Sequence, residues 1–360
     1  MKNIFILLLI LTNILLGNKN SFNIYVSPEG NDNNDGMKLS APVKTLDRAK
    51  YIIIKNLVNI KQNVVIYVKR GIYTQQSVVF NFSIPSYSIT IQGEKNNIPI
   101  FDGRGTSKTW LRVNNHKYSS NNNLHIKNIQ IQNYARAILF KGKKNNWGKD
   151  VSHNTVKHCR FINIGDKYSK SPIGYAAISL FNSRHNVFEK NEFINIENNK
   201  TMCRTKKKRK KCFTTDTHIH AFYMAYYSSY NIIKYNIFEA ISGDAIKVRD
   251  FSNHNLIEYN SFNNVRRVYQ DWYAHYKYLK DEDHIECYSW NNKIQHNKVG
   301  VKYQMMKAAP IKDIKTKFYK SSNQKIFCEK SIFSTYKVQS KNYNKDLTSR
   351  RVYEHNNTNY

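Results

Sequence analysis

Two cations separated by one residue, Lys247 and Arg249, are the strongest candidates for chemistry in this sequence. Arginine presents a planar, always charged fork that holds a carboxylate through two hydrogen bonds. A lysine beside another cation has a lowered pKa, so its amine can act as a base near neutral pH. The pair therefore suits removal of a proton from a carbon that neighbours a carboxylate. Tyr223 and His284 are candidates to protonate a leaving group, and His220 is a second candidate base.

An internal repeat is the element that must bring these residues together. Each copy has an Asn, a short apolar stretch, a second Asn position five residues later, and an apolar or aromatic residue two positions further on. One copy has Cys159 at its second Asn position. The shortest interval suggests a coil of about 24 residues, with loops inserted in the longer ones. The copies start at Asn123, Asn154, Asn186, Asn231, Asn255 and Asn292.

Short alternating strands between Asn-rich turns, repeated at this length, predict an all-β parallel solenoid. Stacked coils would bury Ile, Val and Phe, and stacked Asn side chains would hydrogen-bond along the column. Neighbouring strands lie about 4.8 Å apart, so residues at equal positions in successive coils are in contact. The offset between Asn231 and Asn255 places Tyr223 beside Lys247 and His220 beside Asp244.

The longer offset from Asn255 to Asn292 places His284 over Lys247 and Glu286 over Arg249. Glu286 could then form only a cross-coil salt bridge with Arg249, and Lys247 could be one more solvated lysine. Carboxylates on this face also allow a calcium site, because calcium prefers oxygen ligands. The candidate ligands are Asp244, Asp250 and Glu286.

The first coil resembles a known family. Residues 25–36, followed by Ala41, Pro42 and Thr45, are similar to the N-terminal entry of right-handed parallel β-helix proteins of the pectate-lyase-like superfamily, which includes secreted polysaccharide lyases and uronan epimerases. Residues 243–260 are similar to a coil common in the same proteins. The resemblance spans about residues 22–302 and implies a right-handed parallel β-helix with a short capping helix near residues 46–57. It implies a fold more than a reaction, since the superfamily also contains tail spikes, adhesins and several enzyme classes.

The N-terminus has the pattern of a secretory signal. Lys2 precedes an apolar run over residues 4–16, which ends at Gly17. We therefore expect a signal peptide over residues 1–20, a β-helix domain over 21–301 and a basic C-terminal cap or tail over 302–360. The mature chain would be secreted, or held at the cell surface or in the periplasm. It would have no stable membrane span once the signal is removed.

The charge of the chain suggests a polyanionic partner. Lys and Arg number 57 against 25 Asp and Glu, which gives a formal net charge of +32. An AT-rich genome would also inflate Lys, so composition alone could explain the excess. Export makes nucleic acid an unlikely partner and leaves an anionic polysaccharide as the expected one.

Two insertions leave the coils that carry the candidate residues. The first, residues 265–283, mixes cations with aromatic rings, which suits carboxylates and sugar faces; its candidate substrate-binding residues are Arg266, Arg267, Trp272, Tyr273 and Tyr276. The second, residues 198–217, holds a run of cations between Cys203 and Cys212, for which we expect a disulfide. That run is either a solvated loop or a contact for an anionic polymer.

These features favour a lyase that cleaves a uronate-containing polysaccharide by β-elimination. A uronan C5-epimerase shares the proton abstraction, and a non-catalytic glycan-binding or adhesin protein is the alternative outside enzymes. A glycosidase is less favoured, because it needs two spaced carboxyl groups and the face is mainly cationic. This interpretation requires no cofactor, and calcium is the one metal that it allows.

Overall fold

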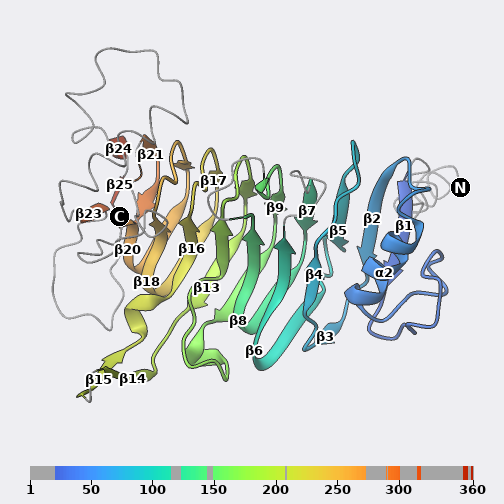
Figure 1. Cartoon of the computed structure of the whole chain (residues 1–360), viewed down its shortest axis with the longest axis horizontal. Coiled ribbons are helices and arrows are strands. Elements are labelled where there is room, and N and C mark those ends of the chain that lie inside the picture. Colours follow the sequence, from blue (N-terminus) through green and yellow to red (C-terminus); the bar gives the residue numbers. More distant parts are fainter. Residues whose placement is uncertain are drawn as a thin grey trace, which may run out of the picture.

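The computed structural model describes residues 21–114, 123–143, 149–206, 209–272, 289, 291–300, 314–317, 352–355 and 358–359. Within this part, the chain winds into successive coils whose strands stack in parallel along one long axis (Figure 1). None of the helices in these residues is long and apolar enough to cross a membrane.

One sheet forms the first side of the coils. Its described strands number ten and pair in parallel in the spatial order β1 (Ser21–Val26), β2 (Asn63–Val68), β5 (Ile89–Gly93), β7 (Leu124–Lys127), β9 (Thr155–Lys157), β12 (Val187–Glu189), β17 (Ile232–Lys234), β19 (Leu256–Glu258), β21 (Asn292–Gln295) and β24 (Val352–His355).

A second sheet bends around a corner and so supplies two further sides. In β18, residues 237–241 pair with β13 and residues 244–248 pair with β16, with a register shift between the two segments of its pairing to β20. The described strands of this sheet are β3 (Ile72–Thr74), β4 (Val78–Phe80), β6 (Ile100–Asn114), β8 (Gln130–Lys141), β10 (Arg160–Ile164), β11 (Ile178–Phe181), β13 (Glu192–Ile196), β16 (His220–Ala225), β18 (Ile237–Val248), β20 (Ser261–Trp272), β22 (Lys298–Val299), β23 (Ile314–Lys317) and β25 (Thr358–Asn359).

The predicted Asn column is present inside the coils. The side-chain amide of Asn231 donates to the side-chain oxygen of Asn255 at 3.0 Å, and that of Asn255 donates to Asn292 at 2.9 Å. Each of these oxygens also accepts a backbone N–H of the preceding coil, so the column satisfies buried turn groups that would otherwise lack partners. Aromatic rings that follow the second Asn position of each repeat also stack, with 5.0 Å between the centroids of Phe193 and Phe238.

The first copy of the repeat lies one residue out of the predicted register. Leu124, not Asn123, occupies the column, and its backbone N–H donates to the side chain of Asn154. Asn123 and Asn128 instead take left-handed turn positions with φ of 43° and 57°. Asparagine is favoured both in stacked columns and at left-handed turns, so residue type alone did not separate the two positions.

A short helix covers the N-terminal end of the solenoid, as predicted. Helix α2 (Leu46–Asn56) starts after Thr45, whose hydroxyl accepts the backbone N–H of Arg48 at 3.0 Å. The carboxylate of Asp32 accepts the backbone N–H groups of Lys44 and Thr45 at 2.7 and 2.9 Å and so fixes the turn that leads into the helix.

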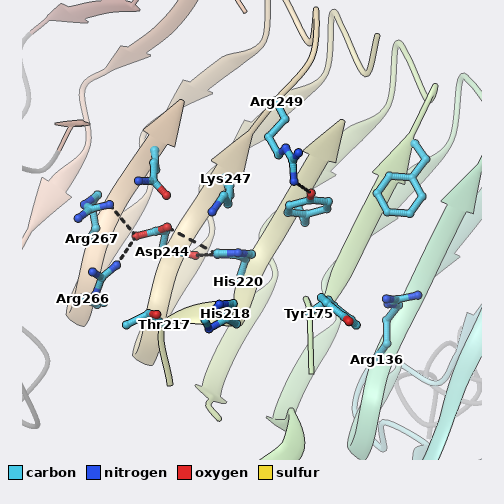
Figure 2. Close-up of a pocket in the computed structure, with 13 residues that line it drawn as sticks. Arg136, Tyr175, Thr217, His218, His220, Asp244, Lys247, Arg249, Arg266 and Arg267 are labelled. Atoms are coloured by element: carbon cyan, nitrogen blue, oxygen red, sulfur yellow. Dashed lines mark hydrogen bonds and ion pairs between the residues drawn. The ribbon is translucent and has the colours of Figure 1, made fainter. Parts of the chain in front are cut away.

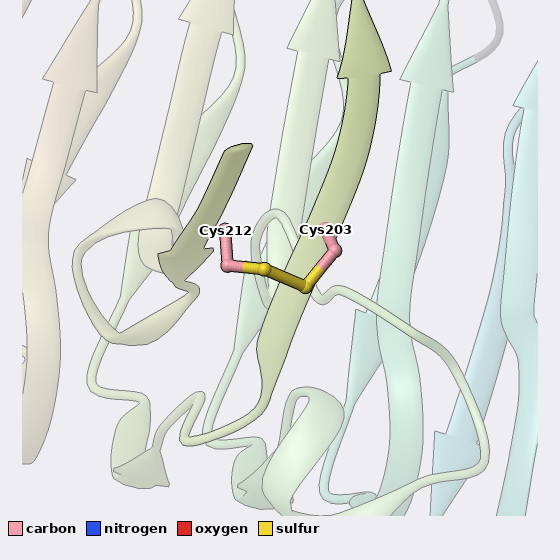
Figure 3. Close-up of a disulfide and its surroundings, with 2 residues drawn as sticks. All are labelled: Cys203 and Cys212. Atoms are coloured by element: carbon pink, nitrogen blue, oxygen red, sulfur yellow. A yellow bond between two sulfur atoms is a disulfide. The ribbon is translucent and has the colours of Figure 1, made fainter. Parts of the chain in front are cut away.

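One antiparallel hairpin projects from the body of the solenoid (Figure 1). It consists of β14 (Thr201–Lys206) and β15 (Arg209–Thr214), and the predicted disulfide joins Cys203 to Cys212 across the two strands (Figure 3). Two 3-10 turns flank this region, η2 (Asp166–Tyr168) and η3 (Asp216–His218).

Strands from the predicted tail extend the solenoid beyond residue 301. Strand β23 pairs in parallel with β20, β24 with β21 and β25 with β22. The rest of residues 302–360, like the expected signal over residues 1–20, lies outside the described residues.

Candidate functional site

A groove of about 720 Å³ crosses the side of the solenoid formed by β8, β11, β16, β18 and β20 (Figure 2). Of the described residues that line it, five are Lys or Arg and one, Asp244, carries a carboxylate. Several of the predicted site residues meet here although they come from different coils. The lining residues are Arg136, Tyr175, Phe181, Thr217, His218, His220, Tyr223, Asp244, Lys247, Arg249, Arg266, Arg267 and Gln270.

Lys247, Tyr223 and Arg249 form the centre of the groove. The register pairs Tyr223 with Lys247, as predicted, while Phe222 and Ile246 beside them are fully buried. Arg249 follows directly after β18, and its Nη1 donates to the phenol oxygen of Tyr223 at 2.7 Å. Because the phenol oxygen accepts this bond, the hydroxyl hydrogen of Tyr223 points away from Arg249. The guanidinium is also placed to stabilise the phenolate that forms when Tyr223 loses its proton.

The environment of Lys247 increases the fraction of its amine that is neutral. Burial lowers the pKa of its amine to about 8; the nearby Asp244 carboxylate opposes this shift, and Arg249, Arg267 and Arg266 reinforce it. At pH 7 such an amine is neutral in roughly one molecule in ten, against roughly one in three thousand at the ordinary value. Lys247 is therefore suited to accept a proton.

His220 is held in one tautomer by the backbone of the next strand. Its Nδ1 lies 3.0 Å from the carbonyl oxygen of Asp244 and 3.9 Å from the carboxylate of the same residue. The shorter contact is to the carbonyl, which accepts only from a protonated Nδ1. Nε2 therefore carries a lone pair. Burial, helped by the charge of Lys247, lowers the pKa of His220 well below its usual value, so the ring stays neutral.

A glycine allows this close approach. A Cβ added at Gly243 would lie 1.9 Å from the carbonyl oxygen of Ile219, far inside contact distance. Any larger residue would push β18 away from the start of β16 and so separate Asp244 from His220.

Asp244 is buried and bound by two arginines. Its Oδ1 lies 2.9 Å from Nη1 of Arg266 and 3.2 Å from Nη1 of Arg267, and Asp244 is 1% exposed. Two guanidinium groups on one carboxylate leave a net positive charge at this end of the groove. Both arginines contact Oδ1, one of the two oxygens that Asp244 could offer to calcium, and the described residues contain no group of three or more His, Cys, Asp or Glu that could hold a metal ion.

The residue beside Lys247 in the following coil is Gln270, not His284 as predicted. Strand β20 stays in the sheet through Trp272, so the extra residues of this coil come after the groove rather than before it. The offset derived from the Asn column consequently does not apply on this side. Arg266 and Arg267 are strand residues for the same reason, and not part of an exposed loop.

Other predicted residues are not brought into the groove by the described structure. Asp250 is buried in the turn after β18, with φ of 45°, and does not line the groove. Trp272 ends β20, and nothing is described of its side chain. The predictions for His284, Tyr273, Tyr276 and Glu286 lie outside the described residues.

Sequence reasoning missed the far wall of the groove. Arg136 lies on β8, with its guanidinium carbon 5.8 Å from the ring centre of Tyr175 and its buried Nε without a hydrogen-bond partner. Ile138 pairs with Ile178, which pairs with Phe222, so Arg136 stands two coils from His220 at the same position along the strand. Extending the register alignment toward the N-terminus would have found it; the misplaced first copy of the repeat hid this relationship.

Comparison with known proteins agrees with the fold. Residues 147–308 match the family model for a right-handed beta helix region. The fold is a right-handed parallel β-helix. No curated protein matches the sequence.

Solved structures similar to this β-helix are distant in sequence. An alginate lyase from Paenibacillus sp. str. FPU-7 is 10% identical with a TM-score of 0.48, over 94% of this chain and 95% of that one. The catalytic domain of an α-1,3-glucanase of glycoside hydrolase family 87 is 15% identical with a TM-score of 0.44, over 71% of this chain and 37% of that one. A rhamnogalacturonan lyase is 13% identical with a TM-score of 0.41, over 77% and 68%.

Proposed function

We propose that this β-helix protein is a polysaccharide lyase that cleaves a uronate-containing polymer by β-elimination. The observation that carries the proposal is the adjacency of Lys247, Tyr223 and Arg249 in a cationic groove, with the guanidinium bonded to the phenol oxygen. A base, an acid and a carboxylate-binding cation are the three groups that this reaction requires.

The reaction follows from the roles of these groups. The neutral amine of Lys247 removes the proton from C5 of the uronate, next to its carboxylate. The guanidinium of Arg249 neutralises that carboxylate, so the electron pair left on C5 is delocalised onto its oxygens. The pair then forms the C4–C5 double bond as the C4–O bond breaks. Tyr223 gives its proton to the departing oxygen, and Arg249 stabilises the phenolate that remains.

The groove gives less support to hydrolysis. Glycosidases of the usual kind need two carboxyl groups on opposite sides of the scissile bond, about 5 to 10 Å apart. Among the residues that the structure describes, Asp244 is the single carboxylate that lines the groove, and Arg266 and Arg267 hold it in ion pairs.

The deciding experiment is ultraviolet absorbance during incubation of the protein with alginate, pectate, chondroitin sulfate, heparin and hyaluronan, with and without calcium. An unsaturated uronate product absorbs, so a rising trace with one polymer identifies a lyase and its substrate class. New reducing ends without absorbance would indicate a hydrolase. Exchange of C5 hydrogen with deuterated water, without cleavage, would indicate an epimerase. Lys247→Met with intact folding should abolish the rise if the proposal is correct.

A further inference from the structure

The hairpin β14–β15 concentrates positive charge on a small element outside the groove. The segment 204–211 contains no acidic residue, and Thr205 is its single uncharged position. Lys210 is exposed, as are both cysteines of the disulfide. The cations of the segment are Arg204, Lys206, Lys207, Lys208, Arg209, Lys210 and Lys211.

The backbone register of the hairpin sets like charges opposite one another. Arg204 pairs with Lys211, and Lys206 pairs with Arg209. Like charges at facing positions destabilise a strand pair, and a two-stranded hairpin is only marginally stable by itself. The disulfide between Cys203 and Cys212 offsets this by restricting the unfolded chain. The hairpin therefore keeps a high density of positive charge although that charge destabilises the pairing of its two strands.

The base of the hairpin is fixed to the solenoid by buried contacts. The backbone N–H of Thr215 donates to the carbonyl of Lys200 at 2.8 Å, which closes the base of the hairpin. The amide of Asn198 donates to the carbonyls of Gly174 and Thr215 at 2.8 and 3.1 Å. The backbone N–H of Asn199 donates to the fully buried carboxylate of Asp166 at 2.8 Å.

The hairpin is also linked to the wall of the groove. The ring of Phe213, on β15, lies 5.2 Å from the ring of His218, and His218 lines the groove. Five residues separate the end of β15 from His220, namely Thr215, the three residues of η3 and Ile219. A polymer that leaves the groove on this side thus meets a second cationic surface within a short distance.

We propose that the hairpin is an ancillary site that binds the acidic polysaccharide outside the groove. The proposal rests on the proposed function for its choice of polymer. A second contact on the same molecule raises the effective concentration of the polymer at the groove, without any new contact at the reacting bond. Binding of a polyanion also reduces the repulsion between the facing cations. The charge of the hairpin and the pairing of its strands therefore both favour an anionic polymer as the ligand.

The test compares two variants that lose the same charge. The hairpin variant replaces Lys206, Arg209, Lys210 and Lys211 with Gln. The control variant replaces exposed lysines near the opposite end of the solenoid, Lys38, Lys44, Lys55 and Lys61, with Gln. Both are made in a Lys247→Met background, so that immobilised polygalacturonate and alginate are not consumed. The salt concentration needed for elution is measured on each resin.

The hairpin variant should elute at clearly lower salt than the control variant, with about tenfold weaker affinity near physiological ionic strength. Equal elution of the two variants would overturn the proposal, because net charge alone would then explain retention. With Lys247 restored, the hairpin variant should lose turnover on long polymer and keep it on a tetrasaccharide. If no polymer is cleaved by any form, the lyase proposal fails, and the retention difference still decides the hairpin site.

Discussion

Nη1 of Arg249 donates a 2.7 Å hydrogen bond to the phenol oxygen of Tyr223 across two neighbouring coils. The bond joins residues 26 positions apart, and it exists because β16 and β18 pair in a register that sets Tyr223 against Lys247. Acid and base are therefore positioned by one pair of strands, and Arg249 directly after β18 is held by its backbone N–H, which donates to the carbonyl of Met224 at 2.8 Å. This gives a rigid arrangement, since strand residues of a packed sheet move less than loop residues.

Replacing Tyr223 with Phe should remove the proton donor and leave the strand intact. We expect kcat to fall about 10²- to 10⁴-fold, the usual contribution of a positioned general acid, with a small change in KM. Steady-state kinetics on the cleaved polymer measures both constants. Thermal unfolding within a few degrees of the parent serves as the control for folding. A variant that keeps more than half of its kcat would remove Tyr223 from the mechanism.

The pH dependence of the reaction should report Lys247. Burial lowers its pKa to about 8 and only the neutral amine accepts a proton, so kcat/KM should rise about tenfold per pH unit up to about pH 8 and then level off. Burial holds the pKa of His220 well below its ordinary value, so His220 should not contribute to a change near pH 8. A profile that instead levels off near pH 6 would point to a histidine as the base.

Lys247 should also lower the stability of the fold in a defined pH window. Its pKa is about 8 in the folded chain and near 10.5 when unfolded, so below pH 8 both states are protonated and the cost is complete. Between these values the folded state loses its proton first, and stability rises with pH. We expect Lys247→Met to stabilise the protein by on the order of 1–3 kcal/mol at pH 7 and by little above pH 10.5.

Urea unfolding at pH 7, 9 and 10.5 measures this difference. The exposed Lys55 provides a matched control, since Lys55→Met should show no such trend with pH. Equal stability of Lys247→Met and the parent at pH 7 would contradict the claim that burial of the charged Lys247 amine destabilises the fold.

Arg136 should act on binding and not on the chemical step. It lines the groove two coils from His220 and takes no part in the bond between Arg249 and Tyr223. Replacement by Gln should raise KM about tenfold for a polymer that reaches this coil, with kcat nearly unchanged, because one charge-assisted hydrogen bond is lost equally in ground and transition states. A disaccharide too short to reach Arg136 is the control substrate. An equal effect on both substrates would contradict the assignment.

The sequence was sufficient where the repeat has no insertion. From Asn231 to Asn255 the coil carries no extra loop, and the pairings of Tyr223 with Lys247 and of His220 with Asp244 follow directly from the Asn offset. The cysteine pair was also readable, because it brackets a run of like charges.

The other site contacts could not be predicted, because they depend on the point at which an insertion leaves the coil. An offset counts the extra residues and says nothing of their position, so Gln270 could not be assigned beside Lys247 from the Asn columns. The contact between His220 and the carbonyl of Asp244 depends on backbone atoms, to which the side-chain pattern gives no access. Arg136 was hidden because Asn123 and Asn128 imitate a column while occupying left-handed turns.

The coil between Asn231 and Asn255 is a natural unit for extending the molecule. Duplicating residues 231–254 would add one strand to each side of the solenoid, and the Asn donor of each copy would meet the acceptor of the next. The duplicated segment contains both Lys247 and Arg249, so a second cationic pair would stand about 4.8 Å along the axis from the first. The distance between such cationic pairs would thus be a whole multiple of the spacing between coils. The number of duplicated coils would set the number of acidic groups along a polymer that the protein can contact.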